Sequence, residues 1–297
     1  MRWRFRSALI LALLSPAAMV GDQLPPAQAV FLDSYTVGNH IPGFGGLSGL
    51  EISENGTRFF ALSDRSILFE GQFARQTGHI TDVIVRAPIP LLQEDGTVFH
   101  GKSGDSEGLA LTNEGQVVIS FEGIPRLSAL PQSRLPGTGL NRFERPDDFR
   151  KMPENAALEA LAVDNAGTFY TLPEDTRDGS DFPVWRFRDH IWDQPFLITR
   201  VGDYLPVGAD FSSEGDLYLL ERRLALTGFA SRIRRFRISG DMISDGEIIL
   251  ETASGQYDNL EGIALWRDTE GRIRITMVSD NNYFILQRTE FVEYMIP

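Results

Sequence analysis

The chain has 297 residues, a formal net charge of −13 at pH 7 and no cysteine. Such an acidic surface repels nucleic acid and anionic lipid, so we expect neither as a partner, whereas it suits cations held by carboxylates. Without cysteine the chain can form no disulfide and carries no cysteine for lipid attachment, so its stability must come from buried apolar surface.

The N-terminal segment has the pattern of a secretory signal. A basic start with three arginines precedes an apolar run over residues 7–20 that is short for a bilayer span. The small-x-small motif that ends at Ala29 predicts cleavage there, with a cut near Ala18 as the alternative. We therefore expect residues 1–29 to be a signal peptide and residues 30–297 to form one periplasmic or secreted domain. An uncleaved anchor is the competing interpretation.

The mature chain contains one internal repeat. Each copy has a polar residue, a small residue, an apolar strand, a turn with glycine and a second apolar strand. Glycine beside Asn, Asp or Glu between two alternating strands is the signature of a β-hairpin. The copies lie roughly 50 to 60 residues apart, the length of a four-stranded propeller blade with its connections. They occupy residues 47–62, 106–119, 158–172, 207–220 and 260–276.

The two ends of the mature chain together supply one further interval of similar length, so we expect them to share a blade. The predicted fold is an all-β propeller of five four-stranded blades, closed by the N- and C-terminal strands so that no sheet edge is exposed there. Six blades are the alternative, if one interval hides a short blade. We expect Gly123–Glu154, rich in proline, to be a long irregular insertion with a short helix near residues 146–151.

The repeat motifs, taken in order, resemble the phytase-like family of exported bacterial β-propellers, described by an "esterase-like activity of phytase". The resemblance implies hydrolysis of phosphate or carboxylic esters, and likeness to phytases implies calcium. The chain departs from dedicated propeller phytases in lacking a long acidic run for several calcium ions. The motifs that carry the resemblance are residues 45–50, 61–65, 105–110, 158–162, 219–223, 232–235, 259–264, 278–283 and 287–289.

Three glutamates, Glu107, Glu159 and Glu261, occupy the same place in their repeats. In a ring of blades they should converge at one radius and one height. Converging carboxylates repel one another unless a cation or an arginine lies among them, and carboxylate oxygens select hard ions such as calcium. The alternative is structural, with each glutamate bonding backbone amides of the next blade.

A second set of acidic positions follows the second strand of each copy. We expect acids at this strand end in all five copies, with Glu221 in the fourth. Asp64 and Asp280 would join Glu107, Glu159 and Glu261 around the metal. Arg65 and Arg222 would bind an anionic group of the substrate, because a guanidinium matches phosphate and carboxylate in two-point contacts. A salt bridge to the neighbouring acid is the alternative for each arginine.

Other chemistry finds little support in the sequence. A paired-histidine zinc motif is missing from the sequence. The patterns G-x-S-x-G (residues 104–108) and G-x-x-x-x-G-K-[ST] (residues 96–103) do occur, but neither stands between a strand and a helix, as a nucleophile elbow or a phosphate-binding loop requires. His100 with Lys102 and Asp105, just ahead of Glu107, could form an acid/base group near the end of the channel, although a solvated loop is the alternative.

The leading hypothesis is a metal-assisted hydrolase of a small anionic or polar ester. Its catalytic residues would be Glu107, Glu159 and His100, and Lys102 would join the two arginines in binding substrate. The cofactor would be calcium, and we expect a monomer that does not bind membranes once the signal is cleaved. The alternatives are a propeller that binds a ligand or protein without catalysis, and a lactonase-type calcium propeller.

Overall fold

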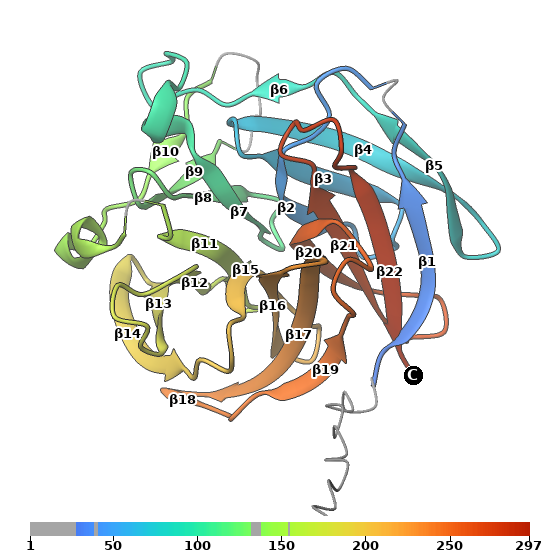
Figure 1. Ribbon diagram of the computed structural model, residues 1–297. Helices are drawn as coiled ribbons and strands as arrows, with labels where there is room; N and C mark the ends of the chain where they lie inside the picture. Colours follow the sequence, from blue (N-terminus) through green and yellow to red (C-terminus); the bar gives the residue numbers. More distant parts are fainter. Residues whose placement is uncertain (1–27, 39–40, 132–137, 154) are drawn as a thin grey trace, which may run out of the picture.

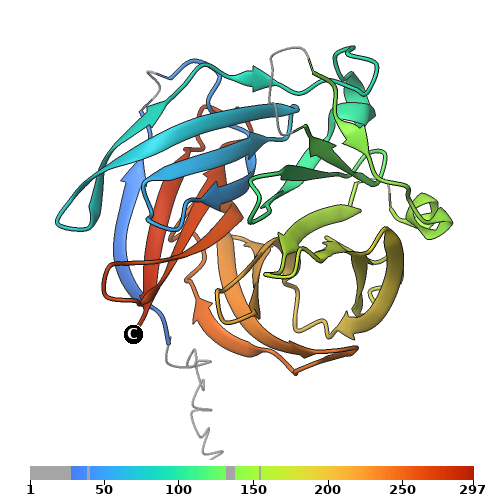
Figure 2. The same ribbon diagram turned by 180° about the vertical axis from the view of Figure 1, so that it is seen from behind.

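The computed structural model describes residues 28–38, 41–131, 138–153 and 155–297. Five antiparallel sheets stand around a common axis, so the described chain is a five-bladed β-propeller (Figure 1). The same ring is seen from behind in Figure 2. The prediction of an all-β fold with five blades is confirmed, and six blades are not formed by the described residues.

In chain order each blade begins with its inner strand, which contacts the inner strands of the neighbouring blades. Blade 1 consists of β2 (Leu47–Ile52), β3 (Arg58–Ser63), β4 (Ile67–Gln76) and β5 (His79–Val85), with β6 (Ile89–Pro90) paired to β4. Blade 2 consists of β7 (Ser106–Leu111), β8 (Val117–Phe121), β9 (Arg126–Leu130) and β10 (Asn141–Arg142). Blade 3 consists of β11 (Leu158–Val163), β12 (Phe169–Pro173), β13 (Phe182–Arg188) and β14 (Ile191–Ile198).

Blade 4 consists of β15 (Leu205–Phe211), β16 (Asp216–Ala225), β17 (Gly228–Ser239), β18 (Met242–Ile243) and β19 (Glu247–Glu251). Blade 5 consists of β20 (Asn259–Arg267), β21 (Ile273–Asp280), β22 (Glu290–Ile296) and β1 (Val30–Thr36). Two short 3-10 helices, η1 (Gly101–Gly104) and η2 (Asp147–Lys151), lie in the connections. No helix among the described residues has the length and apolar character needed to cross a bilayer.

The turn between the first two strands is the same in all five blades. Its glycine has a positive φ, between 67° and 87°, and its N–H donates to the carbonyl three residues earlier. Glycine reaches this conformation without a steric penalty, which is why the turn recurs with glycine. The five glycines are Gly56, Gly115, Gly167, Gly215 and Gly271.

The hydrophobic core is divided among the five interfaces between neighbouring blades. Each interface holds one cluster of buried side chains drawn from the two facing sheets. Between blades 5 and 1, for example, Phe59, Phe73 and Phe291 pack ring to ring with centroids 4.7–5.4 Å apart. Burying each such side chain contributes roughly 1.5–3 kcal/mol, so the interfaces hold the ring rigid.

The ring closes through β1, which pairs with β22 and so combines the first and last strands in one sheet (Figure 1). This confirms the predicted closure. Most of the predicted signal lies outside the described residues, but Gln28 and Ala29 do not. Their N–H groups both donate to Ile249 O, and Ala29 is buried.

The predicted irregular insertion over Gly123–Glu154 is wrong in one respect. It contains β9, whose residues are all buried, and β10, so it supplies the outer half of blade 2. The short helix predicted near residues 146–151 is present as η2. Because proline is disfavoured within strands, the prolines between β9 and β10 argued against a strand pair that the structure contains.

Candidate active site at the channel mouth

The central channel has one end at which the inner strands begin and the second strands end, and we call this end the mouth. Every inner strand carries a β-bulge here, seen as a one-residue shift in its pairing with the second strand. Bulges re-aim side chains and are common beside active sites. The residues at the bulge are Ser48, Glu107, Glu159, Val207 and Glu261.

The three repeat glutamates therefore converge, as the sequence predicts. Burial raises the pKa of Glu107 well above its usual value, and the charges of Glu159 and Glu261 raise it further. Small residues follow the bulges because neighbouring inner strands crowd together. A Cβ added to Gly208 would lie 2.3 Å from Glu261 O, for example.

The pairing register also aligns the ends of the second strands. Gly49, Ala160, Gly208 and Gly262 pair with Leu62, Leu172, Leu220 and Val278. Two residues after each of those partners a polar side chain reaches the mouth. The residues at this position, with the corresponding one of blade 2, are Asp64, Glu122, Glu174, Arg222 and Asp280.

The sequence prediction for blade 4 is off by one residue. Gly208, and not Ala209, is the equivalent of Gly49, and Arg222, and not Glu221, ends the strand at the mouth. Glu221 lies on the other face of the sheet, fully buried, where it accepts hydrogen bonds from Arg232 and Arg234. The prediction of an acid at this strand end in all five copies is therefore wrong, because blade 4 supplies a cation.

Arg222 is the hub of one side of the mouth. Its Nη2 lies 3.0 Å from Glu174 Oε1, while Nη1 contacts Asn259 Oδ1 at 2.5 Å and pairs with Glu261. Burial alone lowers the pKa of this guanidinium, but the charges of Glu261, Glu174 and Glu159 outweigh burial and raise it. Arg222 thus neutralises part of the negative charge that the blades bring together.

The opposite side of the mouth carries a group of three carboxylates from blade 2. Carboxylate oxygens of Asp105, Glu107 and Glu122 all lie within 4.8 Å of one another, an arrangement that fits a metal ion. Burial raises the pKa of Glu122 to about 7, with Asp105 and Glu174 adding to the shift, and burial raises the pKa of Asp105. Ionising all three carboxyl groups together is therefore unfavourable unless a cation lies among them.

Glu159 adds an oxygen with no hydrogen-bond partner in the described structure. The residue is 7% exposed, and its Oε2 is buried and unbonded. Burial, followed by the charges of Glu174 and Glu122, raises its pKa well above the usual value. A buried carboxylate oxygen left unbonded is costly, and a cation among these groups would compensate for it.

Asp280 and Asp64 also belong to the mouth. Burial raises the pKa of Asp280 to about 7, and the charge of Glu261 adds to the shift. Burial likewise raises the pKa of Asp64, which lies close enough to Asp105 to be affected by its charge. We call the eight acids here the mouth carboxylates: Asp64, Asp105, Glu107, Glu122, Glu159, Glu174, Glu261 and Asp280.

The remaining predicted residues lie at the edge of this site. Arg65 is 60% exposed and its guanidinium carbon lies 3.6 Å above the ring of Tyr283. His100 and Lys102 are both exposed, His100 just before η1 and Lys102 within it. The structure thus brings the five predicted metal ligands and Arg222 together, and leaves Arg65, His100 and Lys102 facing solvent.

A second acidic pair lies further along the inner strands and escaped the sequence prediction. Glu51 Oε1 accepts from Leu111 N at 3.0 Å, and Asp210 Oδ2 accepts from Leu265 N at 2.6 Å. Burial raises the pKa of Asp210 to about 7, and burial together with the charge of Asp210 raises that of Glu51. Glu51 lies two residues after Gly49, and Asp210 lies two residues after Gly208. This equivalence can be recognised in the sequence only if Gly208 is aligned with Gly49.

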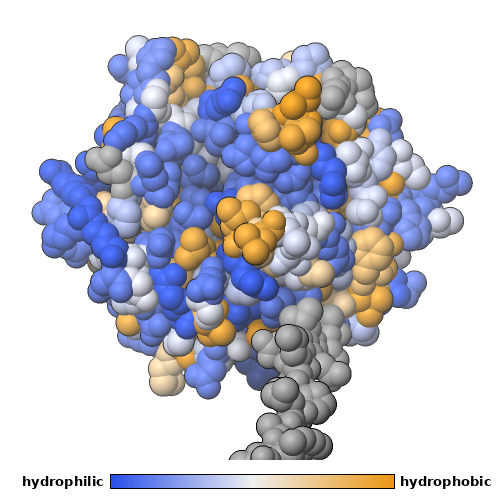
Figure 3. All heavy atoms as spheres, viewed as in Figure 1, coloured by the Kyte–Doolittle hydropathy of each residue, from blue (hydrophilic) through white to orange (hydrophobic). Residues whose placement is uncertain are grey.

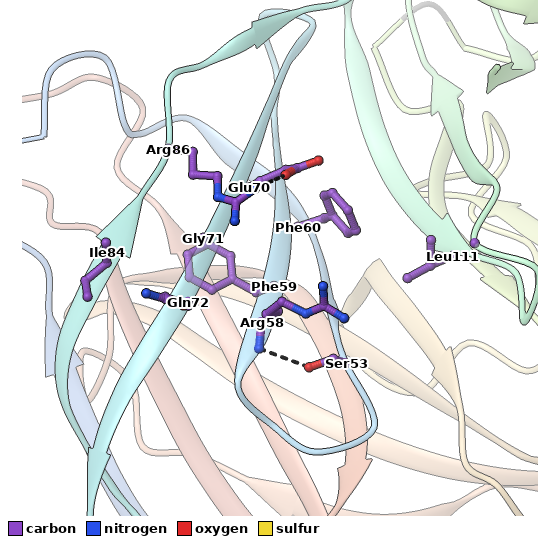
Figure 4. Close-up of a pocket in the computed structure, with 11 residues that line it drawn as sticks. Ser53, Arg58, Phe59, Phe60, Glu70, Gly71, Gln72, Ile84, Arg86 and Leu111 are labelled. Atoms are coloured by element: carbon purple, nitrogen blue, oxygen red, sulfur yellow. Dashed lines mark hydrogen bonds and ion pairs between the residues drawn. The ribbon is translucent and has the colours of Figure 1, made fainter. Parts of the chain in front are cut away.

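An apolar cavity of about 290 Å³ lies away from the mouth, between the outer strands of blade 1 and the inner hairpin of blade 2. Figure 4 shows Phe60 and Leu111 on its facing sides, with Arg86 and Glu70 paired at one end. It contains none of the mouth carboxylates. The titratable groups with shifted pKa values therefore identify the mouth as the candidate active site.

The comparisons with known proteins agree with this fold. A family model described as "Phytase-like: Esterase-like activity of phytase" matches residues 42–283. No curated protein matches the chain.

Solved structures with a similar chain path differ widely in sequence. An α-L-arabinofuranosidase from Podospora anserina, in complex with cellotriose, is 13% identical with a TM-score of 0.53, over 87% of this chain and 94% of that one. The PQQ-bound aldose sugar dehydrogenase of Streptomyces coelicolor is 12% identical with a TM-score of 0.47, over 92% and 99%. A gluconolactonase from Xanthomonas campestris is 15% identical with a TM-score of 0.41, over 80% and 68%. At these identities the likeness concerns the fold alone.

Proposed function

This chain belongs to the phytase-like family, and on that premise we propose that it is a metal-assisted hydrolase of a small polar ester, carboxylic or phosphate. The observation that carries the proposal is the convergence of the mouth carboxylates around Glu159, which has a buried oxygen without a partner. Carboxylates forced together in this way are typical of sites that bind cations or move protons.

Calcium is the metal that we propose. Asp105, Glu107 and Glu122 would hold it, with Glu159 as the next donor, because all of these offer the oxygen ligands that calcium prefers. A bound cation of this kind supplies Lewis-acid polarisation of an ester oxygen or activation of a water molecule. Glu261, predicted as a ligand, pairs with Arg222 and Asn259, so we assign it to holding that arginine in place.

The chain's own groups would do the remaining work. The raised pKa of Glu159 suits it to accept or hold a proton during hydrolysis. Both terminal nitrogens of Arg222 already contact mouth residues, so Arg65, which is more exposed and lies over the ring of Tyr283, is better placed to meet an incoming anion. Catalytic or binding roles for His100 and Lys102 stay predictions from the sequence.

We also propose that the protein acts outside the cytoplasm, in the periplasm or secreted. The basic start and apolar run of the first residues support this proposal. Residues 1–27 lie outside the described structure, so a fractionation experiment with mass determination of the mature chain is the test.

The test of the enzyme proposal measures calcium binding and turnover together. Wild type, Glu107→Gln and Glu122→Gln would be titrated with calcium by calorimetry and assayed on 4-nitrophenyl acetate and 4-nitrophenyl phosphate, with and without chelator. We expect both variants to lose calcium affinity and activity by roughly 10- to 100-fold, the size of effect seen when metal-site residues are changed. The matched control is Glu114→Gln, an exposed glutamate in the turn between β7 and β8.

Two results would contradict the proposal. One is a folded wild-type protein that hydrolyses neither ester with calcium or without it. The other is a Glu107→Gln protein with the calcium affinity and turnover of Glu114→Gln, because the mouth carboxylates would then play no part in the reaction.

A further inference from the structure

The loop between β21 and β22 exposes three large apolar side chains in succession. Phe284, Ile285 and Leu286 are 54%, 92% and 82% exposed. On the face from which Figure 1 is viewed, apolar patches are small and separated by hydrophilic surface (Figure 3). Three adjacent apolar residues turned to solvent in so acidic a chain call for an explanation, because grouped exposed apolar side chains mark places where something binds.

This loop is anchored on both sides of its apolar tip. On one side Asn281 Oδ1 accepts from Gly46 N at 3.0 Å, and the Tyr283 hydroxyl lies 2.9 Å from Ser63 Oγ. On the other side the side-chain Nε2 of Gln287 and the backbone N of Arg288 both donate to the carboxylate of Asp258. Asn282 and Tyr283 have positive φ values of 47° and 49°, which are unfavourable for residues with a Cβ. The tip is therefore held in its exposed position.

A second apolar tip projects from blade 4 on the same side. The β16–β17 pairing continues past Arg222, where β15 ends its own pairing, as far as Ala225 and Gly228. Leu224 and Leu226 on this extension are fully or largely exposed. Phe229 O accepts from Gly255 N at 2.8 Å, which ties the extension to the connection before blade 5.

Between the two tips lies a shallow cleft of about 370 Å³, which we call the mouth cleft. None of the mouth carboxylates lines it, but two of its residues, Phe229 and Asn282, contact residues of the candidate active site. Asn282 N donates to Asp280 Oδ1 at 2.6 Å, and the Phe229 ring centroid lies 5.8 Å from the guanidinium carbon of Arg222. The residues that define the mouth cleft are Phe229, Tyr257, Asn282, Phe284, Leu286 and Arg288.

We propose that the mouth cleft binds the apolar substituent of an ester whose polar group lies at the mouth carboxylates. The substrate class would then be an amphiphilic ester, with a small polar or anionic end and an aromatic ring or a short alkyl chain. This inference rests on the proposed function. The volume of the cleft is near the lower end for small-molecule sites and suits a ring or a chain of a few carbons.

The test compares matched esters that differ in apolar character. Wild type would be assayed on 4-nitrophenyl acetate against 4-nitrophenyl octanoate, and on glycerol phosphate against 1-naphthyl phosphate. In whichever pair the protein hydrolyses, we expect kcat/KM to be at least roughly tenfold higher for the apolar member, because burying one or two methylene groups is enough to give a difference of this size. The Phe284→Ser/Leu286→Ser double variant should lose this preference through KM and keep its activity on the polar member.

The matched control is Ile191→Ser/Met242→Ser, which removes two apolar side chains that are 68% and 70% exposed on β14 and β18, outside the mouth cleft. It should keep the preference of wild type. An unchanged preference in Phe284→Ser/Leu286→Ser would overturn the inference while leaving the hydrolase proposal intact. The inference would also be overturned if Phe284→Ser/Leu286→Ser lost binding to phosphatidylcholine vesicles but kept the ester preference of wild type, because the apolar tips would then bind lipid and not substrate.

A dye-binding measurement separates failure of this inference from failure of the proposed function. If wild type hydrolyses none of the four esters, the hydrolase proposal fails, but the cleft can still be tested with 1-anilinonaphthalene-8-sulfonate. Fluorescence enhancement that is lost in Phe284→Ser/Leu286→Ser and kept in the control supports an amphiphile site. Equal enhancement in all three proteins contradicts it.

Discussion

Arg222 occupies a position at which the other four blades place a carboxylate. Val207 replaces the glutamate of the inner strand in the same blade, so blade 4 contributes one positive charge and no negative charge to the mouth. Arg222 contacts Glu174 and Glu261, whereas Asp105, Glu107 and Glu122 form a separate acidic group on the other side of the mouth. The distribution of charge, and not the number of acids, therefore indicates where a metal would bind.

The raised pKa values of Glu122 and Asp280 predict an unusual dependence of stability on pH. Glu122 and Asp280 have folded-state pKa values of about 7, above the 4.5 and 3.8 expected for the unfolded chain. In the interval between these values the folded protein keeps protons that the unfolded chain releases, so this stabilisation is complete at the acid end and is lost as the pH rises through about 7. Without metal, the melting temperature should fall by several degrees between pH 5 and pH 8.

The measurement is a series of thermal melts in chelator across this pH range. Glu122→Gln, which removes one titrating group, should flatten the curve, and added calcium should reverse the trend because it binds the ionised carboxylates. A melting temperature that rises steadily with pH in chelator would mean that these groups are already ionised in the folded protein.

At the scale of the element, the β16–β17 hairpin carries Arg222 to the mouth and Phe229 to the mouth cleft. Its base is held by Glu221, which accepts from Arg232 Nε at 2.8 Å and from Arg234 Nη2 at 2.6 Å. Both arginines are also buried, and they donate to the carbonyls of Val201 and Thr199.

Glu221→Ala should therefore be strongly destabilising, because it leaves two guanidinium groups buried without their carboxylate. We expect a loss of about 3–5 kcal/mol in the free energy of unfolding, measured by urea denaturation. Asp148→Ala, which breaks the exposed pair with Lys151, should have little effect on the free energy of unfolding. Similar losses for the two variants would show that Glu221 does not support the hairpin.

The fourth repeat shows why part of the site could not be located from the sequence. Gly208 and Ala209 are both small, and the glutamate that marks this position in three other blades is replaced by Val207, so nothing local fixes the register. A shift of one residue moves every side chain to the opposite face of a strand. That shift is why Glu221 was expected at the mouth in place of Arg222.

The repeat itself could be read from the sequence because its turn glycines and alternating strands are local features. Five blades, shared end strands and convergence of the three glutamates all follow from it, and the structure confirms them. The grouping of Asp105 with Glu107 and Glu122, and the mouth cleft, could not be placed in this way. They depend on loops whose conformation is set by contacts far along the chain, such as that of Asn281 with Gly46.

At the scale of the whole molecule, closure of the ring depends on β1. Without it the outer edge of β22 would be unpaired, and an open sheet edge promotes association. A chain that lacks residues 28–36 should melt at least roughly 10 °C lower, since it loses a full strand of pairing, and should form larger species in size-exclusion chromatography. The control is a chain beginning at Gln28. Equal melting temperatures and elution would show that the ring does not need its closing strand.

The odd blade also has a consequence for how a ligand is oriented. Five equivalent blades would offer an entering molecule five degenerate rotations about the channel axis, and selecting one of them by chance would cost about 1 kcal/mol (RT ln 5). Val207 and Arg222 both belong to blade 4, which breaks the pseudosymmetry. The mouth therefore carries a positive charge on the side of blade 4 and negative charges on the sides of the other blades. A dipolar ligand would then favour one of the five orientations about the channel axis over the other four.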